Sequence, residues 1–171
     1  MKNIFVTLSA LLLIHTLSTA QTEVQTIAES SNYTKTSTHQ EVINFISALD
    51  KNSPYLRVEN IGTTTAGKPI PMMIIANPMI KSAENLKNDP RLVIYFQANI
   101  HSGEVEGKEA TLALAREMIN NPNSDFLKNL IVLMVPDLNA DGNDKMSDQN
   151  RTNQNGPSSV GTRYNGQQLD I

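Results

Sequence analysis

His101 and Glu104 are the two side chains whose types and spacing could do chemistry. They stand three residues apart in the stretch HSGE, directly after an apolar run and directly before a long helical pattern. A neutral imidazole nitrogen and a carboxylate oxygen are ordinary zinc ligands, and a turn through Gly103 lets both side chains converge on one ion. The H-x-x-E pattern alone is a weak signal, because composition produces it in about one such chain of six. The pair is therefore a candidate zinc site, and its assignment depends on the secondary structure and motifs around it.

The surrounding pattern is a strand, a turn, a helix and a second strand. Residues 92–100 are predicted to form a strand, and their apolar character on both faces is typical of a central strand in a covered sheet. Residues 105–120 have helical spacing, and 130–135 form another apolar strand. This order predicts a right-handed crossover and a parallel pair. HSGE would then lie at the carboxyl end of a central strand, where open α/β sheets bind ligands.

The other elements follow from local signals. A helix over 38–50 begins with the capping box of Thr38 and Glu41. Two short strands, 55–61 and 69–76, flank a glycine turn and predict a hairpin with one edge unpaired near Pro69 and Pro71. Residues 137–171 have no periodic apolar run, which indicates a functional loop region or a fold with a part missing.

Further polar residues near the pair have ordinary interpretations as well as functional ones. Glu106 and Glu109 are predicted to be first-turn acids that the helix dipole favours. Asn139, Asp141 and Gly142 are turn formers, although such a turn could also hold metal ligands in place through hydrogen bonds. The guanidinium groups of Arg151 and Arg163 could steady an oxyanion or grip a carboxylate. Each arginine alone would be surface charge.

Composition and the first residues limit the class of protein. The 171 residues carry a net charge of −3, no basic run and no cysteine. Nucleic acid is therefore excluded as a partner, and any metal must be held by His, Asp or Glu. Residues 1–20 are predicted to be a secretory signal peptide, since the apolar stretch is shorter than the ~20 residues of a membrane span. We expect a secreted or periplasmic protein without a stable membrane span after signal removal.

The mature chain is predicted to have a flexible leader at 21–37, because this stretch is polar and rich in Ser and Thr. Residues 38–171 follow as one domain.

Four stretches resemble motifs of the zinc carboxypeptidase family, and they occur in that family's order. They are IGTTTAGKPI at 61–70, IHSGEVEGKEA at 100–110, VPDLNADG at 135–142 and GTRYNGQQLDI at 161–171. The resemblance implies a mixed α/β sheet with helices on both faces, here incomplete at the C-terminus. It implies one Zn²⁺ held by His101, Glu104 and a later histidine, and a peptide or protein substrate with a free C-terminus. Arg163 matches the family's oxyanion-stabilising, substrate-binding arginine, and Arg151 is the second choice.

The resemblance stops before the family's motif is complete. Asp170 and Ile171 match the start of D-L-N-R, whose Asn-Arg pair in the family binds the terminal carboxylate, and the third zinc ligand and the general base lie further on. His39 has no support as a ligand. We therefore expect a truncated metallocarboxypeptidase, inactive alone. Two alternatives stay open: a zinc amidase acting on peptidoglycan peptides or N-acyl amino acids, and a non-catalytic binding protein of the same fold.

Overall fold

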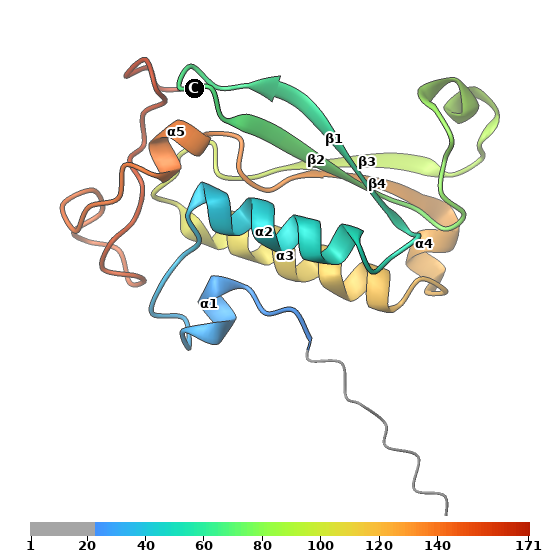
Figure 1. Cartoon of the computed structure of the whole chain (residues 1–171), viewed down its shortest axis with the longest axis horizontal. Helices are drawn as coiled ribbons and strands as arrows, with labels where there is room; N and C mark the ends of the chain where they lie inside the picture. The colour runs from blue at the N-terminus through green and yellow to red at the C-terminus, as the bar shows by residue number, and fades with distance from the viewer. Residues whose placement is uncertain (1–22) are drawn as a thin grey trace, which may run out of the picture.

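The computed structural model describes residues 23–171, so the predicted signal peptide lies outside the described residues. Its centre is a four-stranded sheet in the order β1 (Leu56–Thr63), β2 (Pro69–Ile75), β4 (Leu130–Val135), β3 (Leu92–Gln97). The helices are α1 (Ile27–Ser30), α2 (His39–Asp50), the 3-10 helix η1 (Ala83–Asn88), α3 (Val105–Asn120), α4 (Asp125–Asn129) and α5 (Ala140–Asn143). In Figure 1, α2 and α3 lie side by side against the sheet. Among the described residues, no helix is both long and apolar enough to cross a membrane.

The strand pairing confirms the predicted mixed sheet. β1 and β2 form the antiparallel hairpin, and β2 pairs with β4 only over Met73–Ile75. The end of β2 that contains Pro69 and Pro71 therefore has no second neighbour, as predicted. β3 and β4 are parallel from the Leu92–Leu130 pair to the Gln97–Val135 pair, and α3 connects them.

Within the described residues, the first parallel strand lies at an edge of the sheet, although its apolar residues are typical of a central strand. β3 is an edge strand that ends at Gln97, and Leu92 is 70% exposed and Tyr95 49%. The central strand is β4, which has β2 on one side and β3 on the other. Apolar residues on both faces show that a strand suits burial, but they do not specify its neighbours. Of the two parallel strands, only β3 has an unpaired edge within the described part of the chain.

The main core lies between the sheet and the two long helices. The capping box of Thr38 and Glu41 begins α2 as predicted. Alternate residues of β2 point to opposite faces, so Met73 and Ile75 join the main core while Ile74 joins a smaller cluster near η1. The helical side of the main core consists of buried apolar residues: Val42, Phe45, Ile46, Leu49, Leu112, Ala115, Met118 and Ile119.

The segment before α2 differs from the predicted flexible leader. Residues 27–30 form α1, and its Glu29 makes two hydrogen bonds with Arg116 of α3, at 2.6 and 2.8 Å. Further on, Glu109 accepts bonds from Thr36 Oγ1 (2.9 Å) and Ser37 N (2.6 Å). Glu109 is buried and tied to this segment, so its interpretation as a dipole-stabilised first-turn acid is wrong. We call residues 23–37 the N-terminal strap. Polar contacts hold it together with the apolar residues Val24 and Ala28, and two isolated apolar residues give no periodic pattern in the sequence.

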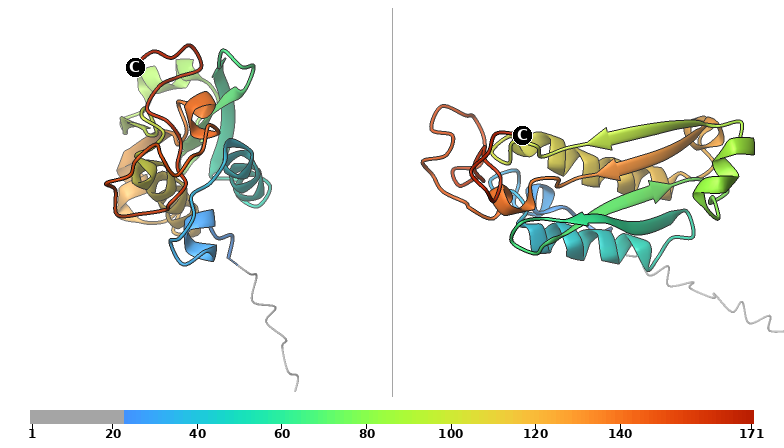
Figure 2. Two further views of the ribbon diagram at one scale, coloured as in Figure 1. Left: turned by 90° about the vertical axis from the view of Figure 1, so that its left-hand side faces the viewer. Right: turned by 90° about the horizontal axis from the view of Figure 1, so that it is seen from above.

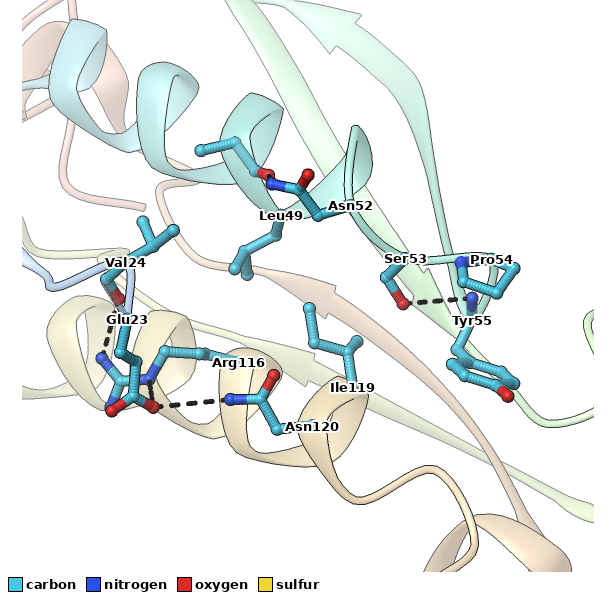
Figure 3. Close-up of a pocket in the computed structure, with 11 residues that line it drawn as sticks. Glu23, Val24, Leu49, Asn52, Ser53, Pro54, Tyr55, Arg116, Ile119 and Asn120 are labelled. Carbon is cyan, nitrogen blue, oxygen red and sulfur yellow. Dashed lines mark hydrogen bonds and ion pairs between the residues drawn. The ribbon is translucent and has the colours of Figure 1, made fainter. Parts of the chain in front are cut away.

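The beginning of the strap borders a cavity of about 250 Å³ at the C-terminal ends of α2 and α3 (Figure 3). There Arg116 Nε lies 3.1 Å from Glu23 Oε1. This cavity is at the end of the helices opposite to HSGE, which directly precedes α3.

Candidate metal centre

Local backbone geometry turns HSGE away from the sheet. Asn99 has a positive φ of 58°, a conformation that asparagine tolerates better than most residues, and it bends the chain two residues before His101. The Glu104 N–H then donates to the His101 carbonyl at 2.8 Å and closes the turn. A Cβ on Gly103 would come 2.7 Å from Arg151 Nε. A side chain at this position would displace Arg151 and press on the Gly161 carbonyl at 3.0 Å, so glycine leaves room for the arginine to lie on the turn.

The structure brings all four predicted site residues together. His101 Nδ1 lies 3.3 Å from Glu104 Oε1. Arg151 Nη2 donates to Glu104 Oε1 at 2.9 Å, and Arg163 Nη1 lies 3.2 Å from His101 Nδ1. Residues 144–171, which carry both arginines, contain no helix or strand, only an isolated bridge between Ser147 and Val160. In Figure 2, this C-terminal segment gathers at the end of the sheet where α5 lies.

Asp170 is a further member of the site that residue patterns did not single out. Its Oδ1 lies 3.1 Å from His101 Nε2, and its Oδ2 accepts from Arg163 Nε at 2.9 Å. The Arg163 guanidinium lowers the pKa of Asp170, and the Asp170 carboxylate raises the pKa of Arg163. Both groups therefore stay charged near neutral pH. The only signal in the sequence was its place in the LDI stretch of the last motif.

The contacts of His101 define which ring nitrogen carries the proton. Arginine has only donors, so Arg163 Nη1 requires an accepting, unprotonated Nδ1. The hydrogen then belongs on Nε2 and points at Asp170. A histidine that donates one ring N–H to a carboxylate keeps its other nitrogen free for a metal. The Arg163 and Asp170 contacts are those of a histidine that ligates a metal through Nδ1, whereas the 3.3 Å contact of Nδ1 with Glu104 Oε1 would suit a donating Nδ1 when no metal is bound.

Glu104 is also in the form that a metal ligand needs. Partial burial by itself would raise its pKa, but the hydrogen bond and charge of Arg151, with a contribution from His101, outweigh burial and lower the pKa. The carboxylate is therefore ionised at neutral pH. Its side chain is 45% exposed, so an ion can reach it from solvent.

Asn139 ties together the two chain segments that carry the site. Its Nδ2 donates to the carbonyl of Ile100 at 3.0 Å and to that of Arg163 at 3.3 Å. Its backbone carbonyl accepts from Ser102 Oγ at 2.7 Å, and Ser102 is fully buried. These bonds reach the residues on both sides of His101, so the turn at 139–142 does support the HSGE backbone, as the sequence suggested.

His39 belongs to a buried network beneath the site. Its Nδ1 lies 2.9 Å from Asp137 Oδ2, and Asn99 donates to Asp137 Oδ1 at 2.6 Å. Lys108 lies in the same network and donates to Asn143 Oδ1 at 2.6 Å. Burial lowers the pKa of Lys108, although nearby carboxylates led by Asp137 oppose that shift. No contact in the described structure links His39 to His101.

Comparison with known families decides what this cluster belongs to. The family model described as zinc carboxypeptidase matches residues 42–170. The chain belongs to the zinc carboxypeptidase family. The family is one of metallocarboxypeptidase hydrolases, which use zinc and act on peptides. No curated protein matches the chain.

Several solved zinc carboxypeptidase structures share the fold. Carboxypeptidase A from Helicoverpa armigera is 23% identical, with a TM-score of 0.54 over 64% of this chain and 26% of its own. The metallo-carboxypeptidase from Burkholderia cenocepacia is 17% identical, with a TM-score of 0.55 over 78% and 31%. That from Pseudomonas aeruginosa, in complex with (2-guanidinoethylmercapto)succinic acid, is 15% identical, with a TM-score of 0.57 over 81% and 32%. The chain spans about a quarter to a third of the length of these structures.

The donor atoms fit the zinc ion that the family uses. Two tetrahedral zinc ligands at ordinary bond lengths are separated by about 3.4 Å, close to the 3.3 Å between His101 Nδ1 and Glu104 Oε1. With the imidazole hydrogen on Nε2, Nδ1 and Oε1 both present lone pairs to the space between them, and this arrangement suits a cation. Two guanidinium groups contact these atoms. In the described part of the chain, no group of three or more His, Cys, Asp or Glu residues is placed to hold a metal.

Proposed function

We propose that this protein contributes to a zinc metallocarboxypeptidase that hydrolyses the C-terminal peptide bond of peptides or proteins. The observation that supports it most is the geometry of His101. Its Nδ1 faces the Glu104 carboxylate while its Nε2 is directed at Asp170. Such a carboxylate–histidine pair beside a second ligand supports a metal site, and membership of the family supports zinc as the metal.

Each residue would have a distinct task. His101 and Glu104 would hold the zinc, and Asp170 would keep the imidazole in the required orientation and tautomer. Zinc, when bound, supplies an activated water and positive charge beside the scissile carbonyl. Arg163 would stabilise the negative charge that develops on the carbonyl oxygen or bind the substrate's carboxylate, and its raised pKa keeps it charged.

Arg151 is the second candidate for that charge stabilisation. In the described structure it is engaged with Glu104, and its side chain is 27% exposed against 42% for Arg163. The less confined Arg163 is the better partner for a substrate.

Peptide cleavage tests the proposal. The protein is incubated with Zn²⁺ and with pairs of peptides that differ only in a free or an amidated C-terminus. Release of the last residue from the free-carboxylate peptides only, abolished by His101→Ala, is the expected result. Equal cleavage of the amidated peptides would contradict the carboxypeptidase assignment, and activity that survives His101→Ala would contradict the zinc ligand assignment.

We also propose export to the periplasm or the outside. The charge and apolar pattern of residues 1–20 support this. N-terminal sequencing of the secreted protein would reveal Gln21 as the first residue, whereas a mature chain that retains Met1 would contradict it.

A further inference from the structure

The tip of the β1–β2 hairpin contacts the turn beneath the metal centre. Thr64 Oγ1 donates to Asp141 Oδ1 at 2.7 Å, and Ala66 N donates to Asp141 Oδ2 at 3.1 Å. Lys68 Nζ donates to the Ala140 carbonyl at 3.0 Å and to Asp144 Oδ2 at 2.5 Å. Asp141 is 5% exposed, and in the described structure its carboxylate oxygens accept from Thr64 and Ala66 rather than from His101. Its carboxylate is therefore committed to the hairpin rather than to the metal.

The other side of the same turn supports the segment that carries Arg163 and Asp170. A Cβ on Gly166 would clash with Asp141 Oδ2. A Cβ on Gly142 would come 2.5 Å from the Tyr164 carbonyl, and one on Gly161 would come 2.7 Å from the Gly142 carbonyl. Thr162 N also donates to the Gly142 carbonyl, at 2.9 Å. Three glycines thus let residues 161–166 lie directly on the turn.

We propose that Asp141 is a positioning residue of the metal centre. Its carboxylate fixes residues 161–170 relative to the hairpin tip, and this placement holds Arg163 and Asp170 against His101. The proposal rests on the proposed zinc function. It adds a structural link between the β1–β2 hairpin at one edge of the sheet and His101, which follows β3 at the other edge. Figure 2 shows the hairpin turn and the C-terminal residues at the same end of the molecule.

The link has a chemical consequence that a general loss of stability would not have. If Asp170 and Arg163 shift, the Nε2–H of His101 loses its acceptor and the ring loses its orientation. Loss of a hydrogen-bond partner of a metal-bound histidine weakens metal affinity about 10- to 100-fold. A change at Thr64 acts through one more contact, so we expect a smaller loss, about three- to tenfold.

Thr64→Val tests the link because it removes the hydroxyl and keeps the shape. Thr64→Ser keeps the hydroxyl, and Thr65→Val changes the exposed neighbour that makes no such bond. Zinc affinity of the full chain is measured by competition with a chromogenic chelator, below the melting temperature of each variant. We expect Thr64→Val to lose affinity about three- to tenfold, while Thr64→Ser and Thr65→Val stay within about twofold of the wild type. Asp141→Asn should reproduce the loss.

Two results would overturn the proposal: unchanged affinity in Thr64→Val and Asp141→Asn, or an equal loss in Thr65→Val. His101→Ala serves as a separate check on the zinc function. If it binds zinc like the wild type, the proposed function fails, and hydrogen exchange of residues 161–170 decides the link alone. Faster exchange there in Thr64→Val than in Thr65→Val would support the link, and equal exchange would overturn it.

Discussion

The ion pair between Glu29 and Arg116 is expected to stabilise the whole domain by anchoring the N-terminal strap to α3. Two hydrogen bonds from Arg116, with support from Thr26, lower the pKa of Glu29 from 4.5 to about 2. That displacement corresponds to at most about 3 kcal/mol of folding free energy. Because the Glu29 side chain is 22% exposed, solvent screening reduces the expected value to about 1–2 kcal/mol.

The sign of the pH dependence follows from the lowered pKa. The contribution of Glu29 is fully present above its unfolded pKa of about 4.5 and is lost as the pH falls toward about 2. Glu29→Gln should therefore lower the free energy of unfolding by about 1–2 kcal/mol at pH 7 and by less than half of that at pH 3. Urea unfolding followed by circular dichroism at the two pH values measures the difference.

Glu23→Gln is the matched control, since Glu23 contacts the same arginine with a side chain that is 56% exposed. We expect it to change the free energy of unfolding by less than about 0.5 kcal/mol. The reasoning is refuted if the two variants are equally stable at pH 7, or if the deficit of Glu29→Gln is the same at pH 3 as at pH 7.

Three further predictions concern the site and the open edge. Glu104→Gln should weaken zinc binding at least about tenfold in a chelator competition, whereas the control Glu106→Gln, at the second position of α3, should leave zinc affinity unchanged. Equal losses of zinc affinity in the two variants would contradict the assignment of Glu104 as a ligand. Asp170→Asn should weaken zinc binding about tenfold with little change in melting temperature, and unchanged affinity would remove Asp170 from the site. Leu92→Lys should lower self-association of the chain in sedimentation velocity, because Leu92 lies exposed on the β3 edge; undiminished association would show that other surfaces mediate it.

Much of the fold was predictable because its signals are local. The Thr38 capping box, the hairpin and the α3 crossover each depend on neighbouring residues, and the structure contains all three. The position of β3 was not predictable from its own residues, because burial of a strand depends on which other strands pair with it. The strap was missed because two ion pairs with Arg116 and several hydrogen bonds hold it, and only Val24 and Ala28 add apolar contact.

The site divides in the same way. His101 and Glu104 were visible because their spacing is short, and the arginines were found through the resemblance of whole motifs. Asp170 was not found, because it lies 69 residues beyond His101 in a segment without periodicity. Only folding brings its Oδ1 to 3.1 Å from His101 Nε2. The role of Asp141 was likewise concealed, because turn formers look alike in sequence whether or not another element docks on them.

Zinc stoichiometry of matched histidine variants tests the central claim most directly. The protein, His101→Gln and His39→Gln are loaded with Zn²⁺, dialysed and analysed for bound metal. The account predicts that His101→Gln loses its zinc while His39→Gln, which changes the buried network without touching the ligand pair, keeps it. Zinc retained by His101→Gln, or lost equally from both variants, would contradict the assignment of His101 as the ligand around which the site is built.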